Sequence, residues 1–314
     1  MQYCKSQTGS IVMNRRDFLK SSVLGALAAS TFGKALSAAA QPVAGDPDMV
    51  ALHGSTPVDM WSKGIKAIGG ISRFVKKGSK VVVKPNIAWT QPPEMAANTS
   101  PELVAAIVRD CLAAGAAEVA VFDHSCDNGP DCYRISGIAA AAKAAGAQVL
   151  SATSRSSYRK VSANGAKAMK EAEVFSAVLD CDTFINVPIL KHHGGAKMSG
   201  AMKNLMGMVW DRRIMHRAGL VNTIPDLLCY RKPDLNVIDA YRMMMDHGPR
   251  GGNLRDVAMG KFMLLSPDPV AIDAAAVKLL RFNEADVRYL KAAADRKFGE
   301  KDLSKLKIER IEIK

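Results

Sequence analysis

Short apolar runs alternate with alanine-rich segments through residues 81–280. The apolar and β-branched runs predict strands over residues 81–83, 118–122, 147–150, 183–188, 235–238 and 262–265. Helical spacing predicts helices over residues 101–114, 135–145 and 270–280. This alternation predicts an α/β fold: a mainly parallel sheet with alanine-rich helices on both faces. We expect residues 81–314 to form a single α/β domain, preceded by an N-terminal lead-in over residues 41–80.

The first 40 residues have the pattern of a targeting segment. Residues 14–20 read NRRDFLK, followed by a mildly apolar run and then small residues at 37–40. The pattern resembles a twin-arginine signal peptide, with Arg15 and Arg16 as the arginine pair and Met13 as the true start. Gly25 and Lys34 interrupt an apolar run already too short for a permanent membrane span. We therefore expect the twin-arginine translocase as a partner during export, and a periplasmic protein.

Composition narrows the class of protein. The 314 residues are 48% hydrophobic and include six cysteines, which excludes a disordered chain and a small disulfide-rich scaffold. The formal charge is +13. Removing the signal peptide, with its five basic residues and one acidic residue, leaves about +9. Nucleic acid is not an expected partner, because the basic residues are scattered, aromatic residues are few and export separates the protein from it.

Two cysteines flank a predicted turn. Cys126 and Cys132 lie on either side of an Asn-Gly-Pro sequence, and an oxidising compartment permits a disulfide between them. The alternative is a metal site that also uses Asp123 or His124. An iron–sulfur cluster needs four closely spaced thiolates, and the sequence has no C-x-x-C motif, so this chain alone is not expected to hold one.

Polar residues follow most of the predicted strands. Ligands in open parallel sheets bind beyond the carboxyl ends of the strands, so these residues are the candidates for a site. They are Lys84, Asn86, Asp123, His124, Lys191, His192, Asp239 and Asp268. Asp123, Asp239 and Asp268 are expected to converge on a divalent metal ion. Alternatively, Asp123 and Asp268 cap helices and Asp239 closes a turn.

Residues 186–204 contain the highest concentration of candidate ligand-binding residues. Two histidines and two glycines precede a helix predicted to start near residue 199, and the segment also contains Lys191, Lys197, Lys203 and Asn204. A helix N-terminus and nearby lysines favour an anion, so the segment predicts an anion site. Because His192 and His193 are adjacent, at most one needs to face the ligand. The alternative is an exposed basic loop.

The glycine-rich sequence over residues 248–253 offers further ligand-binding groups. Arg250 and the backbone of Gly251 and Gly252 are expected to add donors to the same anion site. The alternative is a mobile hairpin or lid.

Several motifs together suggest a family. They include VKPN at 83–86, SPELV at 100–104, INVPILK at 185–191, GAMKNLMG at 200–207 and PDLNVIDA at 233–240. In this order they resemble the family of domains of unknown function number 362 over about residues 81–280. The resemblance implies an α/β protein, in a family whose members are often exported or fused to ferredoxin-like modules, and it assigns no reaction. The candidate residues Lys84, Asn86, Asp123, Lys191, His192, Lys203, Asn204, Asp239, Gly251, Gly252 and Asp268, together with Asp273, match the family pattern.

Three functions fit these features. The first is an exported enzyme for a small carboxylate or phosphate substrate: Lys84, Lys191 and Lys203 bind the anion, His192 is the general acid or base, and Asp123 or Asp239 is a metal ligand or base. The second is a redox or cofactor-bearing protein, in keeping with the family's iron–sulfur fusions. The third is a non-catalytic periplasmic module that binds an anion in the same basic pocket.

Overall fold

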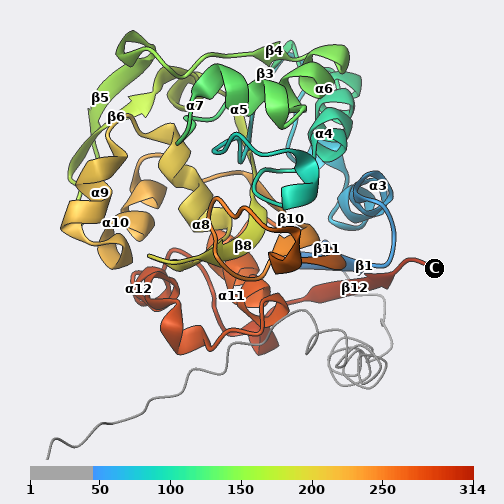
Figure 1. The fold of residues 1–314 in the computed structure, drawn as a ribbon. Coiled ribbons are helices and arrows are strands. Elements are labelled where there is room, and N and C mark those ends of the chain that lie inside the picture. The colour runs from blue at the N-terminus through green and yellow to red at the C-terminus, as the bar shows by residue number, and fades with distance from the viewer. Residues whose placement is uncertain (1–44) are drawn as a thin grey trace, which may run out of the picture. The chain divides into compact units, whose positions relative to one another are not determined.

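The structure is a computed structural model that describes residues 45–314. Arg15, Arg16, Met13 and the rest of the expected signal peptide lie outside these residues. Ten strands form one sheet, whose main path runs in the order β12-β1-β11-β10-β7-β2-β3-β4 (Figure 1). Within the described residues, no helix has the length and apolar content needed to cross a membrane.

Five neighbouring strands of the sheet run parallel. They are β10 (Leu235–Met244), β7 (Thr183–Val187), β2 (Lys80–Pro85), β3 (Glu118–Val121) and β4 (Gln148–Val149). Next to β10, β11 (Val257–Ser266) is antiparallel, and it is followed by β1 (Met49–His53) and β12 (Ile308–Glu312). The predicted mainly parallel α/β fold is therefore confirmed, and along the main path of the sheet β11 is the strand that runs in the opposite direction.

Both faces of the sheet are apolar and covered by helices. Side chains alternate between the faces along a strand, so Val81 and Val83 enter one core and Val82 enters the other. The first core is covered by α3 (Pro57–Ala67), α4 (Pro101–Ala113), α5 (Gly129–Ile135) and α6 (Ile138–Ala144). The second is covered by α7 (Ser176–Asp180), α8 (Ala201–Asn204), α9 (Arg212–Ala218), α10 (Leu220–Asp226), α11 (Pro269–Leu279) and α12 (Arg288–Asp295).

Three elements differ from the sequence prediction. The expected lead-in over residues 41–80 contributes β1 and α3 to the same sheet and core, so the domain begins before residue 81. The helix predicted over residues 135–145 is divided at Gly137, whose φ of 74° lies in the left-handed region that favours glycine. The helix expected from residue 199 is only the four-residue α8, followed by the 3₁₀ helix η4 (Leu205–Met208).

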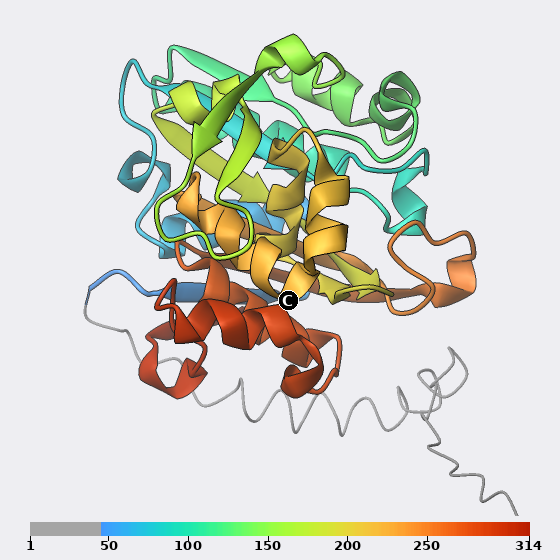
Figure 2. The ribbon, with the colours of Figure 1, turned by 90° about the vertical axis from the view of Figure 1, so that its left-hand side faces the viewer.

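The segment between β7 and α8 forms a hairpin instead of the expected loop. Pro188 separates β7 from β8 (Ile189–His193), which turns back through β9 (Lys197–Ser199). In this hairpin Lys191 pairs with Ser199, and His193 pairs with Lys197. A second, separate sheet consists of β5 (Tyr158–Ser162) and β6 (Glu171–Phe175), whose long connecting loop is seen in Figure 2.

Candidate functional site

The strand-end residues Lys84 and Asp123 bind each other. Lys84 Nζ lies 2.7 Å from Asp123 Oδ1, and both side chains are almost fully excluded from solvent. The second carboxylate oxygen of Asp123 accepts a hydrogen bond of 2.7 Å from the Ile87 amide. Burial lowers the pKa of Lys84, although Asp123 opposes the shift. The structure therefore corrects the prediction that Lys84 is an anion ligand and Asp123 a metal ligand or base, because their charges neutralise each other inside the protein.

Gly207 allows η4 to lie directly against this ion pair. A Cβ atom at this position would lie 1.9 Å from Asp123 Oδ1 and 2.8 Å from Lys84 Nζ. Only glycine leaves the required space, yet the sequence analysis did not single it out. The signal that could have found it is its place at the end of the GAMKNLMG motif.

Four buried or partly buried asparagines form a continuous line of hydrogen bonds, which we call the amide chain. Asn86 Nδ2 donates to Asn204 Oδ1 at 3.0 Å, and Asn204 Nδ2 donates to Asn186 Oδ1 at 2.9 Å. Asn186 Nδ2 in turn donates to Asn236 Oδ1 at 2.9 Å. The amide chain ties β2, α8, β7 and β10 together. Asn86 and Asn204, predicted to bind ligand, therefore use these amide groups in hydrogen bonds within the protein.

The start of α8 is already occupied by a carboxylate of the protein. Asp273 accepts hydrogen bonds from the Ala201 and Met202 amides at 2.5 and 3.1 Å. Burial raises the pKa of Asp273 to about 7. A Cβ on Gly200 would lie 2.3 Å from Asp273 Oδ1, so the glycine makes room for the carboxylate. The prediction of a ligand anion at this helix start is therefore wrong.

Lys191 and Lys203 lie beside these elements without a carboxylate partner. Lys191 is 1% exposed, and its Nζ donates to the Ala97 carbonyl and, at 3.3 Å, to Asn86 Oδ1. Burial lowers the pKa of Lys191 to about 7. The Nζ of Lys203 contacts Met206 Sδ at 3.3 Å, and burial lowers the pKa of Lys203 to about 8. Both ammonium groups are thus held in an unfavourable environment.

Arg212 is the cation that sequence reasoning missed. Its guanidinium donates to the carbonyls of His124 and Ser125 at 2.7 and 2.6 Å, and to Cys126 Sγ at 3.2 Å. These contacts place Arg212, at the start of α9, against the segment that follows β3. The positive charge of Arg212 also contributes to the lowered pKa of Lys203.

We call Lys191, Lys203 and Arg212 the cationic cluster. The charge of Cys126 raises the pKa of Lys191 and of Lys203, Lys203 lowers the pKa of Lys191, and Arg212 lowers that of Lys203, so Lys203 lies within electrostatic range of both Lys191 and Arg212. Among residues 45–314, no carboxylate forms an ion pair with any member of the cluster. The cluster thus contains two of the lysines predicted to bind an anion, together with Arg212, and their binding of a ligand stays a prediction.

The two adjacent histidines lie in different surroundings. His193 is buried, and burial together with Lys203 and Lys191 lowers its pKa to about 2. Its Nδ1 accepts hydrogen bonds from the Gly195 and Ala196 amides at 3.0 and 3.1 Å, so the neutral ring carries its proton on Nε2.

His192 was the predicted general acid or base, and the structure gives it a different environment. Its Nδ1 accepts from the Gly248 amide at 3.1 Å, and its ring packs edge-on against Phe282. Burial lowers the pKa of His192, and the main charges acting on it are those of Asp246 and Lys197. Strand β8 directs alternate side chains to opposite faces, so His192 and His193 differ in their surroundings, and the role of His192 as general acid or base stays a prediction.

The three aspartates predicted to hold a metal ion do not converge. Asp239 accepts hydrogen bonds from the Ser100 and Tyr241 amides, and burial raises its pKa to about 6. Asp268 caps α11 and accepts from the Val270 and Ala271 amides at 2.8 and 3.0 Å. Within residues 45–314, no group of three histidine, cysteine or acidic residues could hold a metal ion. The alternative of a helix cap describes Asp268 correctly, whereas Asp239 lies within strand β10 instead of closing a turn.

The glycine-rich loop lies beside the segment that carries Cys126. Arg250 Nε donates to Asp127 Oδ2 at 3.1 Å, which neutralises the arginine. Gly251 packs closely on Met244, where a Cβ would lie 2.5 Å from Met244 Cε. Gly252 has no such neighbour. Arg250, Gly251 and Gly252 thus border the site without adding a free charge to it.

Lys197 lies outside the cationic cluster. Its Nζ is 4.0 Å from Asp286 Oδ2 and 5.0 Å from the centre of the Phe282 ring. The predicted ligand-binding lysine therefore faces the C-terminal part of the chain.

The predicted disulfide is not formed in the structure. Cys126 is an exposed free thiol beside Arg212, whereas Cys132 is a buried free thiol in the core. Burial raises the pKa of Cys132 to about 11. Cys126 is therefore the thiol that faces solvent at the cationic cluster.

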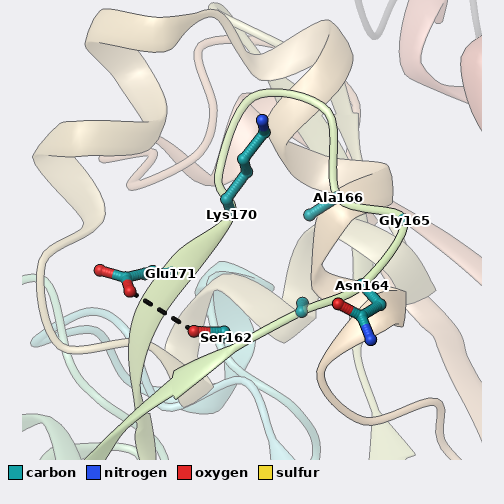
Figure 3. A pocket seen from close by; sticks show the side chains of 7 residues that line it. Ser162, Asn164, Gly165, Ala166, Lys170 and Glu171 are labelled. Atoms are coloured by element: carbon teal, nitrogen blue, oxygen red, sulfur yellow. Dashed lines mark hydrogen bonds between the residues drawn. The ribbon is translucent and has the colours of Figure 1, made fainter.

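A hollow of about 380 Å³ lies elsewhere, in the loop between β5 and β6 (Figure 3). Ser162, Asn164, Lys170 and Glu171 are among its lining residues. The loop is fixed from its inner side by Asp226, which accepts hydrogen bonds from three consecutive backbone amides. The hollow shares no residue with the cationic cluster and is formed by the hairpin loop itself.

Comparison with known proteins gives a family and distant structural neighbours. The model of the family described as "Domain of unknown function (DUF362)" matches residues 81–278. The thylakoid-associated protein sll1697 of Synechocystis is 27% identical over 241 residues, which cover 71% of this chain and 70% of that protein.

Two solved structures share 11% identity with the chain. The lactate racemase apoprotein from Thermoanaerobacterium thermosaccharolyticum has a TM-score of 0.43, with 68% of this chain and 53% of that chain covered. A protein from Thermotoga maritima has a TM-score of 0.37, with coverages of 76% and 58%. The chain thus spans somewhat more than half the length of these two proteins.

Proposed function

We propose a function for this chain, which belongs to the DUF362 family: it is an exported enzyme that binds a small carboxylate or phosphate at the cationic cluster. The observation that carries the proposal is the gathering of Lys191, Lys203 and Arg212 with no carboxylate paired to them among residues 45–314. Uncompensated buried charge is costly. A bound anion would offset this cost, and that favours a ligand over a purely structural role.

The polar groups near the cationic cluster already have partners within the protein, so the cluster itself is the part of the site left to bind a ligand. Asp273, the amide chain and the Lys84–Asp123 pair are each satisfied by contacts within the protein. Arg212 offers a planar guanidinium suited to carboxylate or phosphate oxygens. The position beyond the carboxyl ends of β2 and β3 is the usual place for a ligand in an open parallel sheet.

The binding test compares two consecutive arginines. Calorimetric titration with acetate, pyruvate and inorganic phosphate is carried out on the wild type, Arg212→Ala and Arg213→Ala. Arg213 is 87% exposed and pairs with Asp211, so it is the matched control. We expect Arg212→Ala to lose anion affinity by at least about tenfold and Arg213→Ala to keep it. Equal affinity in all three proteins would refute the proposed site.

Arg212 also holds two backbone carbonyls, so a second variant protects the test from a folding defect. Lys203→Met removes a charge whose recorded side-chain contact is a thioether, and we expect it to weaken the same anions. Thermal unfolding verifies that each variant is folded. If a folded Lys203→Met protein bound every anion as the wild type does, the cationic cluster would not be the binding site.

Export is the second part of the proposal, supported by the arginine pair and the run of small residues before position 41. The test is fractionation of cells producing the full chain with either the natural pair or the double change Arg15→Lys and Arg16→Lys. We expect the natural chain in the periplasmic fraction and the double variant in the cytoplasm. Equal periplasmic recovery of both chains would overturn this part of the proposal.

A further inference from the structure

We propose that Lys203 is a nucleophilic amine that forms an imine with an oxo acid bound at the cationic cluster. The inference rests on the proposed function and specifies its substrate class: a carboxylate that also carries an aldehyde or ketone group. Three lysines near the strand ends could be considered, and their contacts distinguish them.

The amines of Lys84 and Lys191 are buried and already have partners within the protein. Lys84 is 0% exposed and is held by Asp123 at 2.7 Å. Lys191 is 1% exposed and donates to two oxygen atoms, the Ala97 carbonyl and Asn86 Oδ1. Neither amine can approach a ligand without leaving these partners.

Lys203 differs from both in its contacts and its accessibility. The only hydrogen bond recorded for its Nζ within the described residues is to the thioether of Met206, a weak acceptor. The residue is partly, not fully, buried, whereas Lys84 and Lys191 are almost completely buried. Of the three amines, that of Lys203 is therefore the least engaged by partners within the protein.

The surroundings of Lys203 favour the unprotonated amine, which is the form that attacks a carbonyl carbon. Burial lowers its pKa to about 8, and the positive charge of Arg212 acts in the same direction. The charge of Cys126 opposes this shift. A substantial fraction of Lys203 is thus neutral at mildly alkaline pH, whereas an ordinary lysine with a pKa of about 10.4 is almost entirely protonated.

The same surroundings indicate the substrate class. Arg212 supplies positive charge for a carboxylate, while Lys203 supplies the nucleophile. In the reaction, the Nζ lone pair attacks the carbonyl carbon and the carbonyl π electrons move to oxygen. The resulting carbinolamine loses water, with both amine protons leaving on the oxygen, and a C=N bond forms. The step consumes no oxidant or reductant.

The experiment is reductive trapping with pyruvate and cyanoborohydride, read by intact mass and peptide mapping. The proteins compared are the wild type, Lys203→Met, Lys203→Arg and Lys197→Met. Lys197 lies in β9, shortly before α8, but is placed against Phe282 and Asp286, so it is the matched control. We expect one adduct on the Lys203 peptide in the wild type and in Lys197→Met, and none in the two Lys203 variants.

Two results would overturn the imine proposal. One is the absence of an adduct at pyruvate concentrations that calorimetry shows to be saturating, which would leave the anion site intact. The other is an adduct that persists in both Lys203 variants. Failure of the proposed function would give a different result. In that case, Arg212→Ala would bind pyruvate and acetate as the wild type does. Lys203→Arg keeps the charge for the carboxylate and cannot form an imine, so loss of trapping with retained pyruvate binding separates the chemistry from binding.

Discussion

Two polar regions lie at the same end of the parallel strands, and they differ in how completely their groups are satisfied. In the first, the amide chain and the Lys84–Asp123 pair meet their partners inside the protein. In the second, the cationic cluster contains Lys203 and Arg212 with no carboxylate partner among residues 45–314. Both regions use residue types that are typical of binding sites.

The difference shows that residue type and position at a strand end do not by themselves identify a functional group. A lysine that meets an aspartate contributes to stability. A lysine that meets only a thioether retains its capacity to bind or react. Changes in the first region should therefore affect unfolding, and changes in the second should affect ligand binding.

The largest expected effect is on stability, at the buried ion pair. Lys84→Met leaves Asp123 charged and buried, so we expect the free energy of unfolding to fall by about 3–5 kcal/mol. Lys80→Met is the control on the same strand, because Lys80 is 63% exposed and its ion pair with Glu118 is long at 3.6 Å. Its loss should cost less than about 1 kcal/mol. Urea unfolding monitored by circular dichroism measures both, and equal effects would contradict the distinction between the regions.

The next largest effect is expected in the amide chain. Asn186 is fully buried and donates to both the Ala201 carbonyl and Asn236 Oδ1. We expect Asn186→Ala to lower the free energy of unfolding by about 1–3 kcal/mol, because buried partners lose their hydrogen bonds. Asn164→Ala, at an exposed loop position, is the control and should unfold like the wild type. An Asn186→Ala protein as stable as the wild type would show that the chain of amides is not structural.

The cationic cluster should behave in the opposite way. Lys203→Met removes a poorly satisfied charge and replaces it with an apolar side chain, so the free energy of unfolding should change by less than about 1 kcal/mol. The same protein should bind pyruvate more weakly. A large loss of stability in Lys203→Met would mean that this lysine belongs with the structural groups of the first region.

The smallest expected effect concerns the exposed thiol of Cys126. Iodoacetate carries a negative charge and iodoacetamide does not, so positive potential at the cluster should favour iodoacetate. We expect the ratio of the two alkylation rates at Cys126, normalised to free cysteine, to be several-fold higher than one. The ratio should fall towards one in Arg212→Ala. A ratio of one in the wild type would indicate that the cationic cluster produces no positive potential at the Cys126 thiol.

Much of the fold could be predicted from the sequence because its signals are local. The β-branched run at 81–83 and the proline-to-glycine pattern of the helix after residue 100 correspond to β2 and α4. The site was less predictable, because its contacts join distant parts of the chain. Asp273 accepts a hydrogen bond from the amide of Ala201, which is 72 residues away in the sequence. No local sequence pattern near either residue predicts this contact.

The choice between neighbouring residues was also beyond local reasoning. His192 and His193 differ only in which face of β8 they occupy, and that depends on pairing with β9 and β10. Arg212 gave no motif signal, since its importance comes from reaching the segment after β3. The lysines near the strand ends, in contrast, were visible in the sequence, and two of them, Lys191 and Lys203, belong to the cationic cluster.

The most direct test of the central claim is the pH dependence of anion affinity. The positive charges of protonated Lys191 and Lys203 should strengthen anion binding at the cluster, and the pKa values of these lysines are lowered to about 7 and about 8. The charged or titratable groups that interact electrostatically with these two lysines include Asp123, Arg212, Cys126, His193 and His216. The pKa of each histidine is lowered, so both stay neutral as the pH rises.

The measurement is calorimetric titration with acetate, which does not titrate in this range, on Cys126→Ser protein, so that thiol ionisation does not contribute. Deprotonation of both lysines should reduce the affinity by at least about tenfold between about pH 6 and about pH 9. An affinity that stays constant over this range would mean that the anion is held by ordinary surface lysines and arginines, and would contradict the assignment of the cationic cluster as the binding site.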